Sequence, residues 1–169
     1  DGFGDELIIT ESNSNKVNII KVNGYKVPLT NEMNTASVAA RALLDFLNND
    51  SGFDIEINKN IKPGSGIGSS AASAVGAVYG INELLGSPLK KQELLKFAMQ
   101  GEFVSSKTAP ADNVASSLYG GLILVNNREN YNVIQLPVPK NLYAVIHHPL
   151  LEIKTSYSRD VLPKSVDLK

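Results

Sequence analysis

Residues 63–86 read PGSGIGSSAASAVGAVYGINELLG, a glycine-rich run followed by a small and apolar pattern typical of a helix. Gly64, Gly66 and Gly68 have no side chains, so consecutive backbone N–H groups can converge on an anion there. The positive N-terminal end of the following helix adds to that attraction. The stretch therefore predicts a loop that binds phosphate.

The same glycines also fit a simpler interpretation, a tight turn into a closely packed helix. Ala72, Gly76 and Gly80 recur at four-residue spacing and favour such packing. Two hydroxyls favour the phosphate loop, because Ser69 and Ser70 at the first helical turn can cap the helix and ligate a magnesium ion carried by the phosphates. Both interpretations stay open at this point.

Two common phosphate loops differ from this stretch. A Walker loop needs a lysine before its Ser/Thr, and serine occupies that place here. Residues 66–71 satisfy the Rossmann form G-x-G-x-x-A, but the preceding strand alternates polar and apolar residues, and Glu83, at about the expected distance for the acidic residue, lies within the predicted helix. A Rossmann-like module, which would bind NAD(P) without magnesium, is retained as an alternative.

Composition limits the classes of protein to consider. The 169 residues, 43% of them hydrophobic and 20% charged, predict one compact domain over residues 1–169. A net charge of -1 gives no electrostatic reason to expect nucleic acid or an anionic membrane, so a small-molecule partner is expected. The absence of cysteine excludes disulfides and thiolate metal sites and favours the cytoplasm. No apolar run reaches membrane-spanning length.

Strand and helix signals alternate along the chain. Short β-branched runs predict strands at Leu7–Thr10, Val17–Val22, Phe53–Ile61, Leu122–Val125, Val133–Leu136 and Leu142–His147. Helical spacing of apolar residues predicts helices at Thr35–Leu47, Ser69–Leu85, Lys91–Val104 and Asp112–Leu118. Asn34 or Thr35 can cap the first helix, and Gly86 can end the second.

Three segments, in order, resemble the GHMP small-molecule kinases. GSGIGSSAAS (residues 64–73) is similar to the family's phosphate loop P-x-x-x-G-L-G-S-S-A, whose proline usually lies one place earlier, at Lys62. ADNVASSLYGG (111–121) and HPLLEIKTSYSRDVLP (148–163) are similar to two segments of the family's homoserine kinase branch. The resemblance covers almost the whole chain and implies an α/β fold of the α+β type, ribosomal-protein-S5-like, in which a mixed sheet with a left-handed crossover packs with helices.

The resemblance also implies an activity, transfer of the ATP γ-phosphate to the hydroxyl of L-homoserine with Mg²⁺. Pro110 stands where the family often has a histidine, which leaves open another GHMP kinase acting on a different small alcohol. A non-catalytic relative of the family is a further alternative, against which Ser70, Glu102 and Asn113 count. The chain resembles the central part of a longer enzyme, up to the start of the link to a C-terminal domain, and a homodimer is considered for its assembly.

The helical pattern predicts the placement of Glu102, and the four-residue spacing of Thr155 and Arg159 would let both meet one ligand from a single helical turn. Glu102 follows Leu95 by seven residues and Ala98 by four, so on a helix it shares their apolar face. A surface glutamate near a helix end is the alternative. By resemblance, Glu102 and Ser70 hold the magnesium ion that bridges the β- and γ-phosphates.

The remaining roles also come from the resemblance. Asn113 contacts homoserine and Asp112 supports the site, although both could simply cap a helix. Thr155 and Arg159 bind the substrate, with Arg159 clamping its carboxylate, although a lone arginine is usually a solvated charge. ATP is assigned to Pro63, Gly64, Ser65, Gly66, Ile67, Gly68, Ser69, Ser70 and Ala71, with Asn34 near the adenine or acting only as a cap.

Overall fold

The computed structural model describes residues 4–106, 111–126 and 131–147, together with residues 161, 163 and 165. In chain order, its elements are β1 (Glu6–Ser12), β2 (Val17–Gly24), α1 (Thr35–Phe46), β3 (Gly52–Lys59), α2 (Ser69–Leu84), α3 (Lys91–Ser106), α4 (Ala111–Tyr119), β4 (Leu122–Val125) and β5 (Val133–Leu136). The four predicted helices and five of the predicted strands are confirmed, with differences of a few residues at their ends.

The larger sheet is mixed, as the resemblance implied. Its strand order is β1-β3-β2, with β1 antiparallel and β2 parallel to β3. Strand β3 alternates between two faces, and Phe53, Ile55 and Ile57 on one of them are completely buried. Helix α1 connects the parallel strands β2 and β3; the handedness of this crossover stays a prediction.

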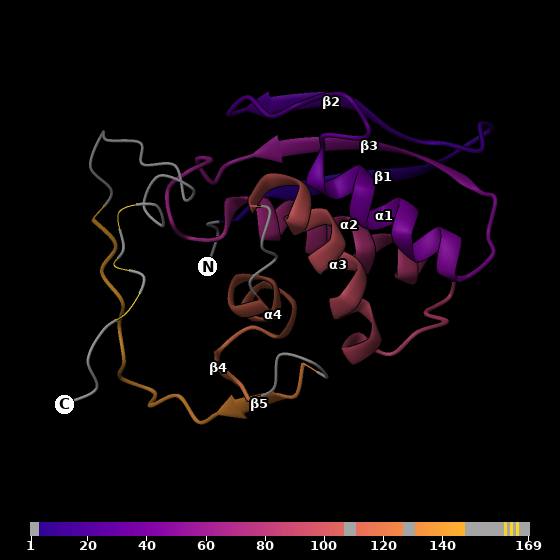
Figure 1. Ribbon diagram of the computed structural model, residues 1–169. Coiled ribbons are helices and arrows are strands. Elements are labelled where there is room, and N and C mark those ends of the chain that lie inside the picture. The colour runs from indigo at the N-terminus through magenta and orange to yellow at the C-terminus, as the bar shows by residue number, and fades with distance from the viewer. Residues whose placement is uncertain are drawn as a thin grey trace.

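The helices lie together on one side of this sheet (Figure 1). Helix α1 contacts β2, α2 contacts β1, and α3 packs against both of these helices. Helix α4 lies against α2 and α3, and β4 of the antiparallel β4-β5 hairpin packs on α4. The first turns of α2 and α4 and the last turns of α3 lie in one region, because Gly68 lies beside Asn113, and Glu102 is near Ser70 and Asp112.

Small residues allow the close packing that their spacing predicted. A Cβ added at Gly76 would lie 3.1 Å from the Leu7 side chain, and one at Gly80 would lie 2.7 Å from that of Ile9. Among the helical glycines, the closest approach involves Gly101 of α3, a position that sequence reasoning did not single out. A Cβ there would overlap the Thr35 carbonyl oxygen and lie 2.8 Å from the Ala39 Cβ and 3.2 Å from the Ala74 Cβ.

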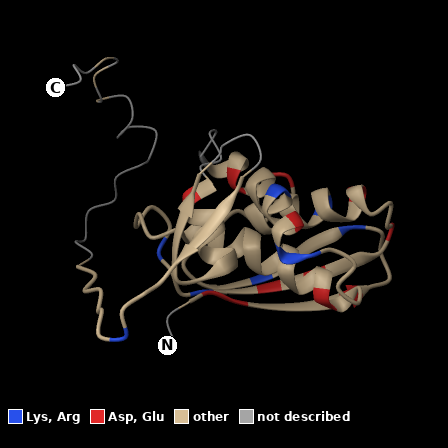
Figure 2. Cartoon of the chain, turned by 90° about the horizontal axis from the view of Figure 1, so that it is seen from below, with Lys and Arg blue, Asp and Glu red and all other residues tan. Residues whose placement is uncertain are grey.

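The strand predicted at Leu142–His147 is wrong. These residues adopt no regular structure and extend away from the body of the molecule (Figures 1 and 2). Tyr143 is 85% exposed and Val145 is 95% exposed. A β-branched run forms a strand only beside a strand that accepts its hydrogen bonds, and none of the described strands lies beside this one.

Charged residues of both signs are interspersed along the chain in the view of Figure 2. Within the described residues, no helix is both long enough and apolar enough to cross a bilayer. The expectation that the partner is a small molecule stays a prediction.

Substitution of Gly101 tests the close approach of α1, α2 and α3. We expect Gly101→Ala to lower the free energy of unfolding by about 1–2 kcal/mol, because overlap with a backbone carbonyl outweighs the gain of up to about 1 kcal/mol in helix propensity. Urea unfolding measures this difference. Gly4→Ala is the control, since a Cβ at Gly4 meets no atom within 4 Å. Equal stability of the Gly101 variant and wild type would contradict the proposed packing constraint.

Candidate functional site

The loop before α2 has the backbone geometry of an anion cradle. Gly68 is the N-cap of α2 with φ 80°, a conformation that strongly favours glycine, and it makes no side-chain capping bond. A Cβ added at Gly66 would meet no atom within 4 Å, so the loop is open on that side. The first N–H groups of α2 therefore remain available to an external acceptor.

Ser65 gives independent support for a ligand at this loop. Its Oγ is buried, and no hydrogen-bond partner is found for it within the described part of the chain. A buried hydroxyl without a partner costs about 1–3 kcal/mol. A bound oxygen-rich group, such as a phosphate, would satisfy it.

The two adjacent serines at the start of α2 have different surroundings. The Ser69 hydroxyl is buried and donates to the Ile61 carbonyl at 2.8 Å, which ties the helix to the chain segment after β3. The Ser70 hydroxyl instead lies close enough to the carboxylate of Glu102 to lower the pKa of that carboxyl. Ser70 is therefore the hydroxyl that lies at the candidate cation site, whereas the Ser69 hydroxyl has a structural partner.

Glu102 lies on the buried face of α3, as its spacing predicted. It is 5% exposed, and the Ser105 hydroxyl donates to its Oε1 at 3.2 Å. Burial raises the pKa of the Glu102 carboxyl, and the nearby Asp112 carboxylate adds to this effect. The hydrogen bonds from Ser70 and Ser105 and the charge of Lys59 act in the opposite direction on this pKa.

The first turn of α4 completes the cluster. Asp112 Oδ1 accepts the backbone N–H of Asn113 at 2.7 Å, so this carboxylate satisfies one of the first N–H groups of α4 from within its first turn. A Cβ added at Gly68 would lie 3.5 Å from the Asn113 Cβ, which places the start of α4 directly beside the start of α2. The fold thus brings Gly68, Ser70, Glu102, Asp112 and Asn113 into one small region.

The oxygen ligands in this region fit Mg²⁺. This ion keeps several waters and uses one or two protein oxygens together with phosphate oxygens. The hydroxyl of Ser70 and the carboxylate of Glu102 form such a pair. In the described ranges, no group of three or more His, Cys, Asp or Glu residues could hold a metal by itself, so an ion here would need oxygens from a ligand.

Asn34 is the N-cap of α1, the role that its sequence position also suggested. Its side-chain oxygen accepts the Ala36 N–H at 3.0 Å, and its amide nitrogen donates to the Pro28 carbonyl at 2.6 Å. A contact between Asn34 and adenine stays a prediction. The predicted substrate residues Thr155 and Arg159 lie outside the described residues.

Sequence reasoning missed a buried ion pair beside the site. The side chains of Lys59 at the end of β3 and Asp5 before β1 are each 1% exposed and form this pair. Burial lowers the pKa of Lys59, and the Asp5 carboxylate partly offsets that effect. One signal was available, because Lys59 continues the alternation of Phe53, Ile55 and Ile57 and so falls on the buried face.

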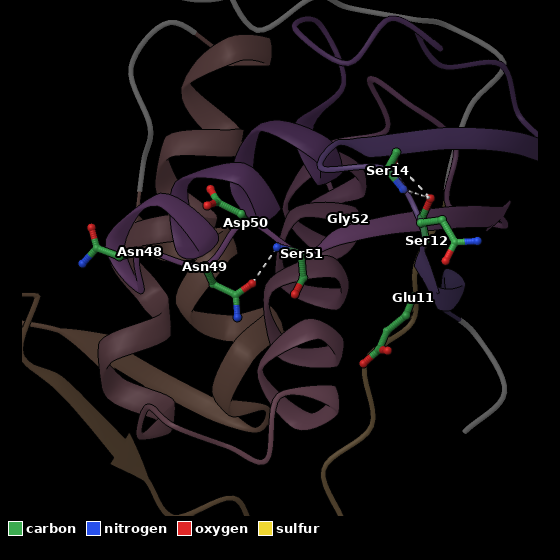
Figure 3. Close-up of a pocket in the computed structure, with 9 residues that line it drawn as sticks. Glu11, Ser12, Ser14, Asn48, Asn49, Asp50, Ser51 and Gly52 are labelled. Atoms are coloured by element: carbon green, nitrogen blue, oxygen red, sulfur yellow. Dashed lines mark hydrogen bonds between the residues drawn. The ribbon is translucent and has the colours of Figure 1, made fainter.

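A separate hollow of about 540 Å³ lies at the other end of the sheet (Figure 3). Polar residues of the end of β1, of the β1-β2 connection and of the segment between α1 and β3 line it, among them Glu11, Ser14 and Asp50. Strand β3 begins at this hollow and ends near the glycine loop. None of the residues predicted for the site lines the hollow.

Comparison with known proteins identifies the family. The family model for the N-terminal domain of GHMP kinases matches residues 34–121, slightly more than half of the chain. The chain therefore belongs to the GHMP kinase family. This match and the mixed sheet argue against the Rossmann alternative.

Several homoserine kinases are similar to the chain. The homoserine kinase of Chlorobium phaeobacteroides is 38% identical, over 98% of this chain and 56% of the relative. The homoserine kinase of Methanococcus vannielii is 40% identical, over 85% of this chain and 47% of the relative. The crystal structure of homoserine kinase from Cytophaga hutchinsonii matches with a TM-score of 0.93 and 44% identity, over 99% of this chain and 54% of that chain. The chain spans about half the length of the curated relatives it matches.

The raised pKa of Glu102 predicts a pH-dependent stability. Between the ordinary pKa of a carboxyl and the raised value, the folded protein binds more protons than the unfolded chain, so stability falls as pH rises through this window. Without divalent cations or nucleotide, we expect Glu102→Gln to be more stable than wild type at neutral pH and the difference to shrink on acidification. Urea unfolding across pH measures it, with the exposed Glu32→Gln as control. A difference that grows on acidification would contradict the assignment.

Proposed function

We propose that the full-length protein is a homoserine kinase, which transfers the γ-phosphate of ATP to the side-chain hydroxyl of L-homoserine. The observation that carries this proposal is the convergence of the glycine loop with Ser70, Glu102 and Asn113 in a member of the GHMP kinase family. Relatives named homoserine kinase, 36–40% identical to the chain, support the choice of substrate. The cytoplasm is the proposed compartment, and a homodimer stays a prediction.

In the proposed complex, the loop from Pro63 to Ala71 binds the phosphates of ATP. The N–H groups at the start of α2 would donate to phosphate oxygens, and the buried Ser65 hydroxyl would gain the partner it lacks among the described residues. Ser70 and Glu102 would hold Mg²⁺, which neutralises charge on the phosphates during transfer. Adenine would lie on the side of Asn34.

Asn113, beside Gly68, is proposed to orient the attacking hydroxyl of homoserine. Thr155 and Arg159 would complete the substrate site, with the Arg159 guanidinium forming a bidentate pair with the substrate carboxylate. Phosphoryl transfer depends mainly on positioning and on electrostatic stabilisation of the transferring group. A dedicated general base is therefore not required by this proposal.

A coupled assay of ADP release by the full-length protein tests the reaction and the substrate together. We expect turnover with homoserine and Mg²⁺, little with mevalonate or galactose, and none in EDTA. Glu102→Gln should fold and lose kcat by about 10²–10³-fold, since a charged group that acts in the transition state is removed. Preference for another alcohol would assign the protein to a different branch of the family, and near-wild-type turnover of the variant would remove Glu102 from the metal site.

Substrate choice is tested most directly at Arg159. We expect Arg159→Leu to raise the KM for homoserine far more than the KM for ATP, with a loss in kcat/KM corresponding to about 2–4 kcal/mol, because the variant leaves the substrate carboxylate without its partner. Asn113→Ala is the contrasting variant, which should lose kcat through misalignment of the hydroxyl. Steady-state kinetics with each substrate varied separately measure both. Unchanged homoserine kinetics in Arg159→Leu would show that the carboxylate is bound elsewhere.

A further inference from the structure

The Lys59–Asp5 ion pair lies directly beneath the phosphate loop, and the proposed reaction assigns it no role. Lys59 Nζ donates to three acceptors, the Asp5 carboxylate, the Ser69 carbonyl oxygen and, at 2.8 Å, the Ser73 hydroxyl. Ser69 and Ser73 belong to the first turns of α2. The ammonium group therefore uses two of its three donors on the start of the helix and the third on Asp5.

Asp5 holds the chain on the other side of the loop. Its Oδ1 accepts the backbone N–H groups of Asn60 and Ile61, both at 3.0 Å. Its Oδ2 accepts the Ser73 hydroxyl at 3.2 Å. The residues that precede the loop and the helix that follows it are thus bound to one buried pair.

The hydrogen bonds of the ion pair reach the chain on both sides of the loop, which comprises residues 62–68. The Ser69–Ile61 hydrogen bond of 2.8 Å joins the two residues that flank it. Its ends are therefore fixed relative to each other, while Gly66 within it remains open to an incoming group.

We propose that Lys59 and Asp5 are positioning residues that clamp both ends of the phosphate loop and keep its N–H groups arranged for the nucleotide phosphates. The proposal rests on the proposed function, in that the anion at the loop is taken to be ATP. Neither residue touches the nucleotide; both act through the backbone of residues 60–61 and through Ser69 and Ser73.

General energetics favour this role over a purely stabilising one. Well-packed apolar residues of similar volume often replace a buried ion pair with no loss of stability, so a buried pair is weak evidence for a stabilising role. What apolar residues cannot supply is a set of directed hydrogen bonds between two chain segments. A loop that is already ordered loses less conformational entropy when the ligand binds, which strengthens binding without adding a contact.

The test is nucleotide binding by the full-length protein, measured by calorimetry with MgATP and separately with adenosine. Lys59→Met combined with Asp5→Asn removes both charges and keeps an oxygen for the N–H groups of Asn60 and Ile61. Ser73→Ala removes two hydrogen bonds and keeps the ion pair. The matched control is Lys21→Met combined with Glu56→Gln, which removes a surface ion pair of 3.4 Å from β2 and β3 of the same sheet.

We expect the double variant to unfold cooperatively and to bind MgATP at least tenfold more weakly, with unchanged affinity for adenosine and an unchanged KM for homoserine. Ser73→Ala should lose several-fold in MgATP affinity, and the control pair should match wild type. A general loss of structure would weaken adenosine and MgATP binding alike, so the difference between the two ligands isolates the loop.

Wild-type MgATP affinity in the folded double variant would overturn the clamp. If the double variant shows no cooperative unfolding transition, the MgATP affinity of Ser73→Ala is the test instead. Wild-type affinity in that variant would overturn the clamp. Failure of the wild type to bind MgATP would instead overturn the proposed function. The clamp would then be judged by amide hydrogen exchange of residues 62–68, which must rise in Ser73→Ala and stay at the wild-type level in the control pair.

Discussion

The close approach of α1, α2 and α3 is the constraint on which the site depends. Gly101 leaves room for the Thr35 carbonyl and for Ala39 and Ala74, so the three helices meet with no side chain between the backbones of α3 and α1. The next residue on α3 is Glu102, whose carboxylate thereby reaches Ser70 at the start of α2. A larger residue at position 101 would move the carboxylate that is proposed to bind the metal away from the loop and would also disturb the core.

Local signals explain how much of the fold the sequence predicts. Asn34 caps α1 and Gly86 follows the C-cap of α2, and each of these signals acts within a few residues of its helix end. The period of β3 and the spacing of Glu102 on α3 are likewise properties of single elements. The exposed segment at residues 142–147 shows the limit of such reasoning, because a strand also needs a neighbour that its own sequence does not specify.

The candidate site could be predicted only in part, for the same physical reason. The glycine loop and the buried position of Glu102 follow from patterns within one segment of sequence. The hydrogen-bond and ion-pair partners of the side chains around them lie in other segments, and local patterns do not predict them. Apart from the family resemblance, nothing in the sequence distinguishes Ser69, which bonds the Ile61 carbonyl, from Ser70, which lies beside the Glu102 carboxylate. The pairing of Lys59 with Asp5 joins residues 54 positions apart and becomes visible only once β1 and β3 lie side by side.

The buried charges around α2 partly compensate one another. A buried carboxylate such as Glu102 is costly when ionised, and the nearby Lys59 offsets part of that cost, while Asp5 balances Lys59 in turn. Lys62 is the one charged residue of the loop, and the segment from Pro63 to Gly68 carries none. Along that segment, the attraction proposed for an anion would come from fixed backbone dipoles. Fixed dipoles need no reorganisation when charge develops during transfer, provided that the two ends of the loop stay in place.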